Sequence, residues 1–332
     1  MLVNVLLFAL GLLMLIKGGD WFVDSASGIA RRFHLPELLI GATVVSIGTT
    51  LPEVMVSVQG AMAGSGGMAY GNAVGSIICN TSLIAALTVA IKPGKVERRA
   101  LIVPVSFFFV AAAFYMSIAY FTGYFSRAVG IVLLALFAVY MTVTFLQMKK
   151  VPASELDGYV DEVPAEENET ESSQKASMVK DIVFLVIGAA LIALGANLLV
   201  ENGTAIATKL GVPDTVIALT FVALGTSLPE LVTAITALVK GHGALSLGNV
   251  IGANLFNLVL VSGASTVISP FPVPSESTIA GHPASLVLDL PVMLGVMLIL
   301  TVPALIRKKL SRVQGIVLLA IYVAFCTLQF IM

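Results

Sequence analysis

The stretch GTTLPE at residues 48–53 returns as GTSLPE at residues 225–230, and each copy places a glutamate near the middle of a long apolar segment. These glutamates, Glu53 and Glu230, are 177 positions apart. A carboxylate inside apolar sequence is costly to bury, so its repetition in one local motif indicates a role that the chain needs twice.

A second motif repeats at the same spacing. GNAVGS at residues 71–76, followed by Asn80, recurs as GNVIGA at residues 248–253, followed by Asn257, again 177 positions later. One offset shared by two separated motifs is hard to obtain by chance. The sequence therefore predicts two duplicated halves, each of which contributes oxygen ligands to a common site.

Composition indicates a membrane protein. Of the 332 residues, 58% are hydrophobic and 11% are charged, and the mean hydropathy is +1.01, more apolar than a soluble domain of this length needs. We expect an all-α membrane protein with ten transmembrane helices, five in each half. The expected spans are residues 1–23, 36–62, 68–91, 100–122, 126–147, 179–200, 212–239, 243–268, 284–306 and 312–331.

An odd number of spans in each half predicts an inverted repeat, because the second half then enters the bilayer in the opposite orientation. Basic residues agree with this topology, since they are retained on the cytoplasmic side of short loops. With both termini outside and the central loop cytoplasmic, the inner connections hold 15 of the 18 basic residues: Arg31, Arg32, Lys92, Lys95, Arg98, Arg99, Lys149, Lys150, Lys175, Lys180, Lys240, Arg307, Lys308, Lys309 and Arg312.

Three regions follow from this reading. Residues 1–148 form the first five-helix repeat, residues 149–178 an acidic cytoplasmic linker, and residues 179–332 the second, inverted repeat. Between residues 151 and 174 the linker has eight acids and no base. This composition predicts a solvated, disordered tether, with a regulatory calcium site as the alternative.

Each glutamate has hydroxyl groups in the preceding turn. Thr49 lies four residues before Glu53, and Thr226 lies four before Glu230, so a hydroxyl and a carboxylate share one helix face and can reach one ion. The alternative is a protonated glutamic acid hydrogen-bonded to a neighbouring helix. Duplication of the whole arrangement favours an ion site.

A proline precedes each glutamate. Pro52 and Pro229 lack a backbone N–H and clash with the carbonyl four residues earlier, so we expect the helix to open at Gly48 and Gly225. A freed carbonyl within a membrane needs protein, water or an ion, which makes the nearby carbonyls candidate ligands. A plain kink is the alternative for either proline alone.

The second motif places an amide at mid-membrane in each half. Ser76 and Asn80 share a helix face, and Asn257 is the amide of the other half. We interpret the amides as ion ligands or as groups that orient the glutamates, with interhelical hydrogen bonding as the alternative. The glycines of this motif have the small-xxx-small spacing of closely packed helices, and we assign them to packing: Gly71, Gly75, Gly248 and Gly252.

Calcium is the cation that this set of ligands suits. It takes six to eight hard oxygens from carboxylates, carbonyls, amides and hydroxyls. No histidine falls in either motif, and neither Cys79 nor Cys326 suggests a zinc site, which argues against zinc or copper. We expect Ca²⁺ and Na⁺ as transported ions and no prosthetic group.

The motifs resemble the two alpha repeats of the calcium/cation antiporter superfamily, and nearly the whole chain is similar to prokaryotic sodium/calcium exchangers of the bacterial inner-membrane type. The resemblance implies an inner (plasma) membrane antiporter that exchanges calcium for sodium by alternating access. It implies the following ion ligands, the last two through their carbonyls: Thr49, Thr50, Glu53, Ser76, Asn80, Thr226, Ser227, Glu230, Ser46 and Ala223.

Two positions depart from the family pattern. Asn257 stands where many relatives carry an aspartate associated with potassium co-transport, so we expect no potassium requirement. Ala253 stands where relatives commonly carry a serine, which removes a hydroxyl expected to bind one sodium ion.

Three alternative functions stay open at this stage. The first is a proton/calcium antiporter, or one for another divalent cation, that uses the same glutamates. The second is an intramembrane enzyme with two acids as general acid and base, but the chain carries no other catalytic motif and we expect no enzyme. The third is a channel, which does not require a neutralisable pair of acids.

The net charge of the protein also limits which binding partners we expect. A net charge of −1 leaves no basic surface for nucleic acid. The expected partners are calcium and sodium ions and the lipid bilayer, with no obligate protein partner.

Overall fold

The structure is a computed structural model that describes residues 2–33, 35–148, 171–210, 225–275 and 277–331. Within these ranges, nine helices are long and apolar enough to cross a membrane, and a shorter apolar helix spans Leu228–Val239. The short helix lies in the expected seventh span, whose residues 212–224 fall outside the described residues. The predicted fold class, an all-α membrane protein, is confirmed.

Each half is a succession of long helices, and the described residues include four wider π-helical turns, two in each half. The first half consists of α1 (Leu2–Arg32), α2 (Glu37–Ile40), η1 (Gly41–Val45), α3 (Ser46–Met62), α4 (Gly66–Cys79), η2 (Asn80–Ala85), α5 (Ala86–Ile91), α6 (Arg98–Thr122), β1 (Tyr124–Phe125) and α7 (Arg127–Met148). The second consists of α8 (Glu171–Lys209), α10 (Leu228–Val239), α11 (Gly243–Phe256), η5 (Asn257–Val261), α12 (Ser262–Ile268), β2 (Phe271–Pro272), β3 (Thr278–Ile279), β4 (His282–Pro283), η6 (Ser285–Asp289), α13 (Leu290–Arg307) and α14 (Arg312–Ile331). Helix α8 begins at Glu171, within the region that the sequence assigns to the linker.

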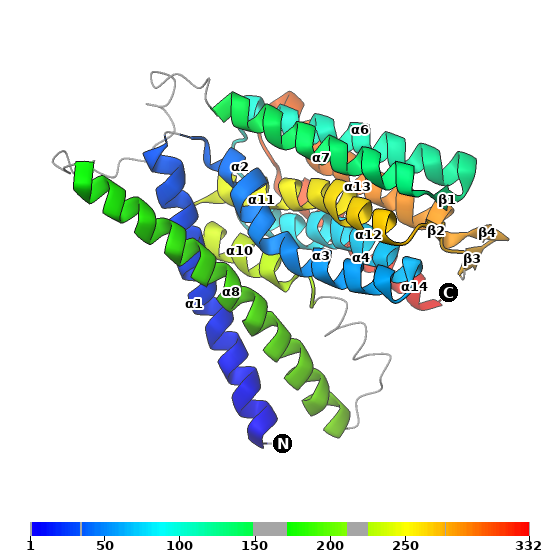
Figure 1. Cartoon of the computed structure of the whole chain (residues 1–332), viewed down its shortest axis with the longest axis horizontal. Helices are drawn as coiled ribbons and strands as arrows, with labels where there is room; N and C mark the ends of the chain where they lie inside the picture. The colour runs from blue at the N-terminus through cyan, green and yellow to red at the C-terminus, as the bar shows by residue number, and fades with distance from the viewer. Residues whose placement is uncertain (1, 34, 149–170, 211–224, 276, 332) are drawn as a thin grey trace.

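The first helices of the two halves, α1 and α8, pack side by side and run in opposite directions along one side of the bundle (Figure 1). Glycines make this approach possible. A Cβ atom on Gly11 would lie 2.8 Å from the carbonyl oxygen of Gly195, and one on Gly18 would lie 2.9 Å from that of Gly188. The antiparallel pair is the geometry that an inverted repeat requires.

Loops that the sequence assigns to one side of the membrane do meet in space. At one end of the bundle, β1 pairs with β2 and joins the α6–α7 connection to the segment after α12. At the opposite end, Lys95 and Lys309 form an isolated β-bridge between the α5–α6 and α13–α14 connections. The strands β1 to β4 lie together at the right of Figure 1. Each set of connections therefore occupies one face.

Ion pairs connect α1 to the second half at the end of the bundle that carries the Lys95–Lys309 bridge, which we call the basic end. Arg32 contacts Asp181 of α8 at 2.9 Å, and Lys240, after α10, contacts Asp24 at 2.8 Å and Asp20 at 3.2 Å. Partial burial disfavours the charge of Lys240, but its hydrogen bonds to Asp24 and Asp20 raise its pKa above the ordinary value.

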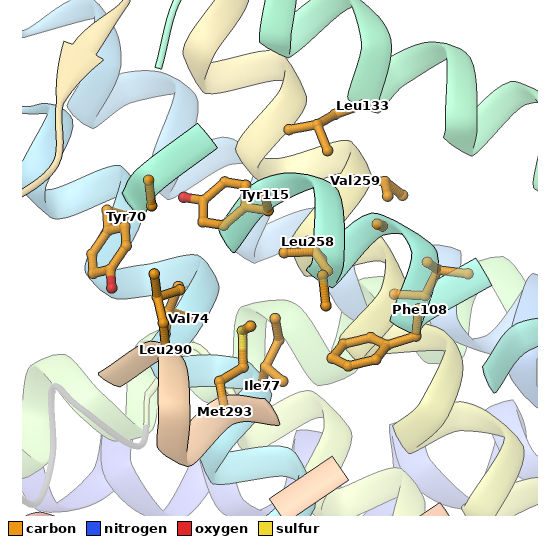
Figure 2. Packing of buried hydrophobic residues seen from close by; sticks show 14 of the residues in the cluster. Tyr70, Val74, Ile77, Phe108, Tyr115, Leu133, Leu258, Val259, Leu290 and Met293 are labelled. Atoms are coloured by element: carbon orange, nitrogen blue, oxygen red, sulfur yellow. The ribbon is translucent and has the colours of Figure 1, made fainter. Parts of the chain in front are cut away.

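The largest apolar core combines side chains from both halves (Figure 2). Tyr115 of α6 stacks on Phe125 with ring centroids 4.4 Å apart, and Leu258 and Met293 join the same cluster from the second half. Van der Waals packing of this kind, rather than exclusion from water, holds helices together in lipid. The two halves therefore share one core.

The motif glycines behave differently in the two halves. A Cβ atom on Gly248 would lie 2.2 Å from the carbonyl oxygen of Leu38, and one on Gly252 would lie 2.3 Å from the Ser46 hydroxyl, so both are packing positions as predicted. At Gly71 and Gly75, a Cβ atom would meet no heavy atom of the described residues within 4 Å. The packing assignment is wrong for that pair, which lines a hollow beside η6 and α14.

This asymmetry gives a matched test of packing at equivalent positions. Gly248→Ala should destabilise the purified protein by about 1–3 kcal/mol, the usual cost of overpacking, because the new methyl group meets the Leu38 backbone. Gly71→Ala should leave stability unchanged or slightly raise it, because Ala is the better helix former. Thermal unfolding in detergent measures both. Equal effects would contradict the difference in packing between Gly248 and Gly71.

Candidate cation-binding site

The two glutamates of the repeated motif meet inside the bundle. Glu53 lies on α3 and Glu230 on α10, and both residues are 0% exposed. Helices α3 and α10 are in contact, and the two carboxylates are close enough to repel each other when charged. Two acids that are 177 positions apart in sequence thus form a single buried group.

The prolines act differently in the two motifs. Helix α3 runs without a break from Ser46 to Met62 with Pro52 inside it, so the expected opening at Gly48 is wrong, and the wider turn lies upstream in η1. Helix α10 begins only at Leu228, with Pro229 in its first turn. The expected opening is therefore found in the second half, where a proline in the first turn costs no helical hydrogen bond.

Both mid-membrane amides stand at the start of a π-helical turn. Asn80 begins η2 and Asn257 begins η5, and both residues are 0% exposed. The packing is crosswise: α3 contacts η5, and α10 contacts η2. Each glutamate helix thus lies against the asparagine segment of the other half. Such π-helical turns are frequent at functional sites.

Hydroxyl groups lie on the helices that carry the carboxylates, in the turn before α10, and on α4, which packs against α3. Thr50, Ser227, Ser76 and Ser46 are buried, and Thr226 is partly buried in the turn before α10. Thr49 is buried beside Glu230, although it belongs to the other half. Ser227 and Glu230 both lie near Cys79, the residue before Asn80. Ala223 lies outside the described residues.

Many of these polar groups have no protein partner. The unpaired atoms, judged within the described part of the chain, are both carboxylate oxygens of Glu53 and of Glu230, the hydroxyls of Thr50 and Ser227, and the side-chain amides of Asn80 and Asn257. Unpaired buried polar atoms are rare in folded proteins and each costs free energy. Carboxylate, hydroxyl and amide oxygens gathered in this way fit a hard cation such as Ca²⁺ or Na⁺.

The described part of the candidate site has only two acidic side chains, which is few for a site that holds a metal ion permanently. Among the described residues, no three His, Cys, Asp or Glu side chains come together. Neutral oxygens therefore supply most of the ligands available around the two carboxylates. A site of this kind suits an ion that must leave again, because fewer charged ligands bind Ca²⁺ less tightly.

Sequence analysis did not assign a role to one residue that links the halves, Asn249. Its Oδ1 accepts a hydrogen bond from the Thr49 hydroxyl at 3.2 Å, and its Nδ2 donates to the Thr233 hydroxyl at 3.1 Å. The Ser46 hydroxyl also lies 2.9 Å from the Asn249 carbonyl oxygen. Asn249 therefore fixes the position of α3 relative to α10.

The equivalent residue of the first half, Asn72, has a similar role. Its Nδ2 donates to the Glu53 carbonyl oxygen at 3.1 Å and to the Ser57 hydroxyl at 2.7 Å. The signal for both asparagines was present in the sequence, since they recur at the common offset of 177 positions. Both position the backbone that carries a glutamate.

Comparisons with known proteins now define the class of this inverted-repeat membrane protein. The family model described as sodium/calcium exchanger protein matches residues 3–146 and 180–331, which is nearly the whole chain. The chain belongs to the sodium/calcium exchanger family.

Curated relatives match over most of their length. Sodium/calcium exchanger MaX1 of Methanosarcina acetivorans is 33% identical, with 99% of each chain covered. The putative antiporter CaxA of Alkalimonas amylolytica is also 33% identical over 99% of each chain. The inner membrane protein YrbG of Escherichia coli is 34% identical over 81% of each.

A solved structure shares the fold. The sodium-calcium exchanger NCX_Mj, solved after soaking with Na⁺ and Sr²⁺, superimposes with a TM-score of 0.78 at 32% identity and with 97% of each chain covered.

The repulsion between the carboxylates predicts a measurable effect on stability. In sodium-free, calcium-free buffer at a pH at which both carboxylates are ionised, Glu53→Gln should raise the stability of the protein by about 1 kcal/mol or more, because it removes an uncompensated buried charge. Adding Ca²⁺ at a hundredfold excess over its dissociation constant should stabilise the wild type by about 2.7 kcal/mol and the variant much less. Thermal unfolding reports both changes.

The matched control is Glu201→Gln, the same chemical change at an exposed position of α8. It should neither raise the ion-free stability nor remove the response to calcium. If Glu53→Gln keeps the full calcium response, Glu53 is not part of the cation site.

Proposed function

We propose that this protein is a secondary active antiporter that exchanges calcium for sodium across the membrane by alternating access, with Glu53 and Glu230 as shared cation ligands. One observation carries the proposal: two fully buried carboxylates from opposite halves lie close enough to repel each other when charged, and their oxygens accept no hydrogen bond among the described residues. Membership of the sodium/calcium exchanger family supports it.

Charge explains why exchange is obligatory. The ion-free site carries −2 when both glutamates are ionised, and one Ca²⁺, a set of Na⁺ ions or two H⁺ cancel this charge. Moving bare carboxylates through a low-dielectric interior costs several kcal/mol for each charge, even after relaxation. Reorientation is therefore favourable only when the site is loaded, so that ions of one kind leave as ions of the other kind return.

We assign different roles in ion binding to the different oxygen ligands. The two carboxylates are the ligands that neutralise calcium, and sodium ions share them. Thr49, Thr50, Ser76, Thr226 and Ser227 complete the shells with hydroxyl oxygens, and the carbonyls of Ser46 and Ala223 add to them. Asn80 and Asn257 coordinate an ion or orient the glutamates. No prosthetic group is needed for this chemistry, since the site binds and releases ions without a covalent step.

We also propose an orientation. The face that joins Lys95 to Lys309 carries most of the basic residues and is assigned to the cytoplasm, with both termini outside. The membrane is then the inner (plasma) membrane of a prokaryote, with repeats at residues 1–148 and 179–332 and an acidic linker between them. The resemblance of the chain to YrbG, an inner membrane protein, supports this assignment.

Transport in liposomes tests the proposal. A sodium gradient directed out of the vesicles should drive calcium uptake by the wild type, and Glu53→Gln or Glu230→Gln should abolish this flux, because an amide does not neutralise a divalent ion. Glu201→Gln should transport like the wild type. Radioactive calcium uptake measures all four proteins.

A pH gradient imposed on the same vesicles distinguishes the proton-coupled alternative. Calcium uptake that follows the proton gradient and ignores the sodium gradient would falsify sodium coupling. Retained uptake in either glutamine variant would instead contradict the role of the glutamates, whichever ion is coupled.

Ala253 provides a gain-of-function test. This residue is fully buried on α11, one helical turn before Asn257. Ala253→Ser restores a hydroxyl at the place where the other half has Ser76, so sodium binding should strengthen, and half-maximal sodium for exchange should fall severalfold. Unchanged sodium dependence would identify Ala253 as a packing position.

A further inference from the structure

One charged surface lies apart from the ion site. At the basic end of the bundle, the connection between α5 and α6 and the connection between α13 and α14 are joined as a short antiparallel ladder. Lys95 pairs with Lys309, the Val96 N–H donates to the Lys308 carbonyl at 2.9 Å, and the Leu310 N–H donates to the Gly94 carbonyl at 2.9 Å.

We call the joined connections the basic platform. Together with the helix ends that flank them, residues 92–99 and 307–312, they contain a single acid, Glu97, and eight basic residues: Lys92, Lys95, Arg98, Arg99, Arg307, Lys308, Lys309 and Arg312. Membrane topology explains why basic residues lie on this face. It does not explain why two connections from different halves of the chain are hydrogen-bonded into one surface.

The local geometry is unfavourable for cations alone. Lys95 and Lys309 stand opposite each other in the bridge, and like charges in that relation destabilise the pairing. Lys308 has φ 55°, the left-handed conformation that glycine usually adopts at the end of a helix. An anion held between the lysines would offset the repulsion.

A hollow adjoins the platform. It has a volume of about 240 Å³ and is bounded by Lys92, Lys95 and Glu97 on the polar side and by Leu247 and Leu310 on the apolar side. Charged and apolar walls therefore meet in one place, at the level where the helices end.

Apolar side chains continue outward from the platform along the ends of α5, α13 and α14. Exposed fractions are 75% for Ile306, 68% for Val313, and 58% for both Ile91 and Ile316. Such residues on a spanning helix face acyl chains. A ligand that satisfies both surfaces carries a negative headgroup and a hydrocarbon tail, which free phosphate does not.

We propose that the basic platform binds the phosphate headgroup of an anionic phospholipid from the adjoining leaflet, with the acyl chains along Ile306 and Val313. Clusters of Lys and Arg directly beside membrane helices recognise anionic lipids in this way. The inference is independent of calcium exchange, because lipid retention can be measured on protein that is not transporting.

Native mass spectrometry of the full-length protein in detergent tests the inference. Titration with phosphatidylglycerol should give tighter retention than phosphatidylcholine of the same chain length. Lys95→Gln with Lys309→Gln should weaken phosphatidylglycerol binding about 30-fold, because each basic residue near an anionic headgroup contributes about a factor of five to six. Phosphatidylcholine binding should not change.

Two further variants separate charge at the platform from charge elsewhere. Arg31→Gln with Lys180→Gln removes two charges from exposed positions outside the platform and should leave phosphatidylglycerol retention as in the wild type. Lys95→Arg with Lys309→Arg keeps the charge and should retain the lipid. Thermal unfolding of each variant verifies the fold.

Three results would overturn the inference. They are equal retention of the two lipids, unchanged retention after Lys95→Gln with Lys309→Gln, and displacement of phosphatidylglycerol by millimolar inorganic phosphate, which would indicate a general anion site. Carbodiimide cross-links from Lys309 to the acidic segment at residues 155–169, without a lipid preference, would indicate an intramolecular partner instead.

Discussion

Two carboxylates buried side by side in a low-dielectric interior are the constraint on which the rest of this structure depends. Glu53 and Glu230 are 0% exposed and repel each other, so a protein that keeps them there must offer a compensating positive charge. Hydroxyl and amide groups on the same helices and on segments packed against them also lack hydrogen-bond partners among the described residues. These groups are the ligands that we propose for an incoming ion.

Contacts between and within the two halves hold the helices that carry the two glutamates in place. Asn249 links Thr49 to Thr233 across the repeats, and Asn72 holds the Glu53 backbone from within the first half. Close packing at Gly248 and Gly252 fixes α11 against the segment that leads into α3. In the mechanism that we propose, a change in how the halves pack would change which side of the membrane the ions reach.

Much of the fold followed from the sequence, because hydropathy fixes span positions and basic residues group the connections on two faces. The glutamates, the prolines and the amides were found from one repeated offset. What the sequence could not predict has a physical explanation. Sequence spacing is identical in the two motifs, yet α3 continues through Pro52 whereas α10 starts at Leu228, because backbone geometry depends on the neighbours that each half meets. For the same reason Gly71 and Gly248 look alike in sequence, but of the two only Gly248 packs against other described residues. The role of Asn249 required knowledge of which helices touch.

The claim that bare carboxylates cannot reorient is tested most directly by calcium efflux from loaded liposomes into medium in which choline is the only cation besides buffer, at a pH on both sides that keeps the two glutamates ionised. The account predicts no efflux beyond the protein-free leak until Na⁺ or Ca²⁺ is added outside, after which efflux begins at once. Efflux into the choline medium at the full exchange rate would show that the empty site crosses freely, and would contradict the account.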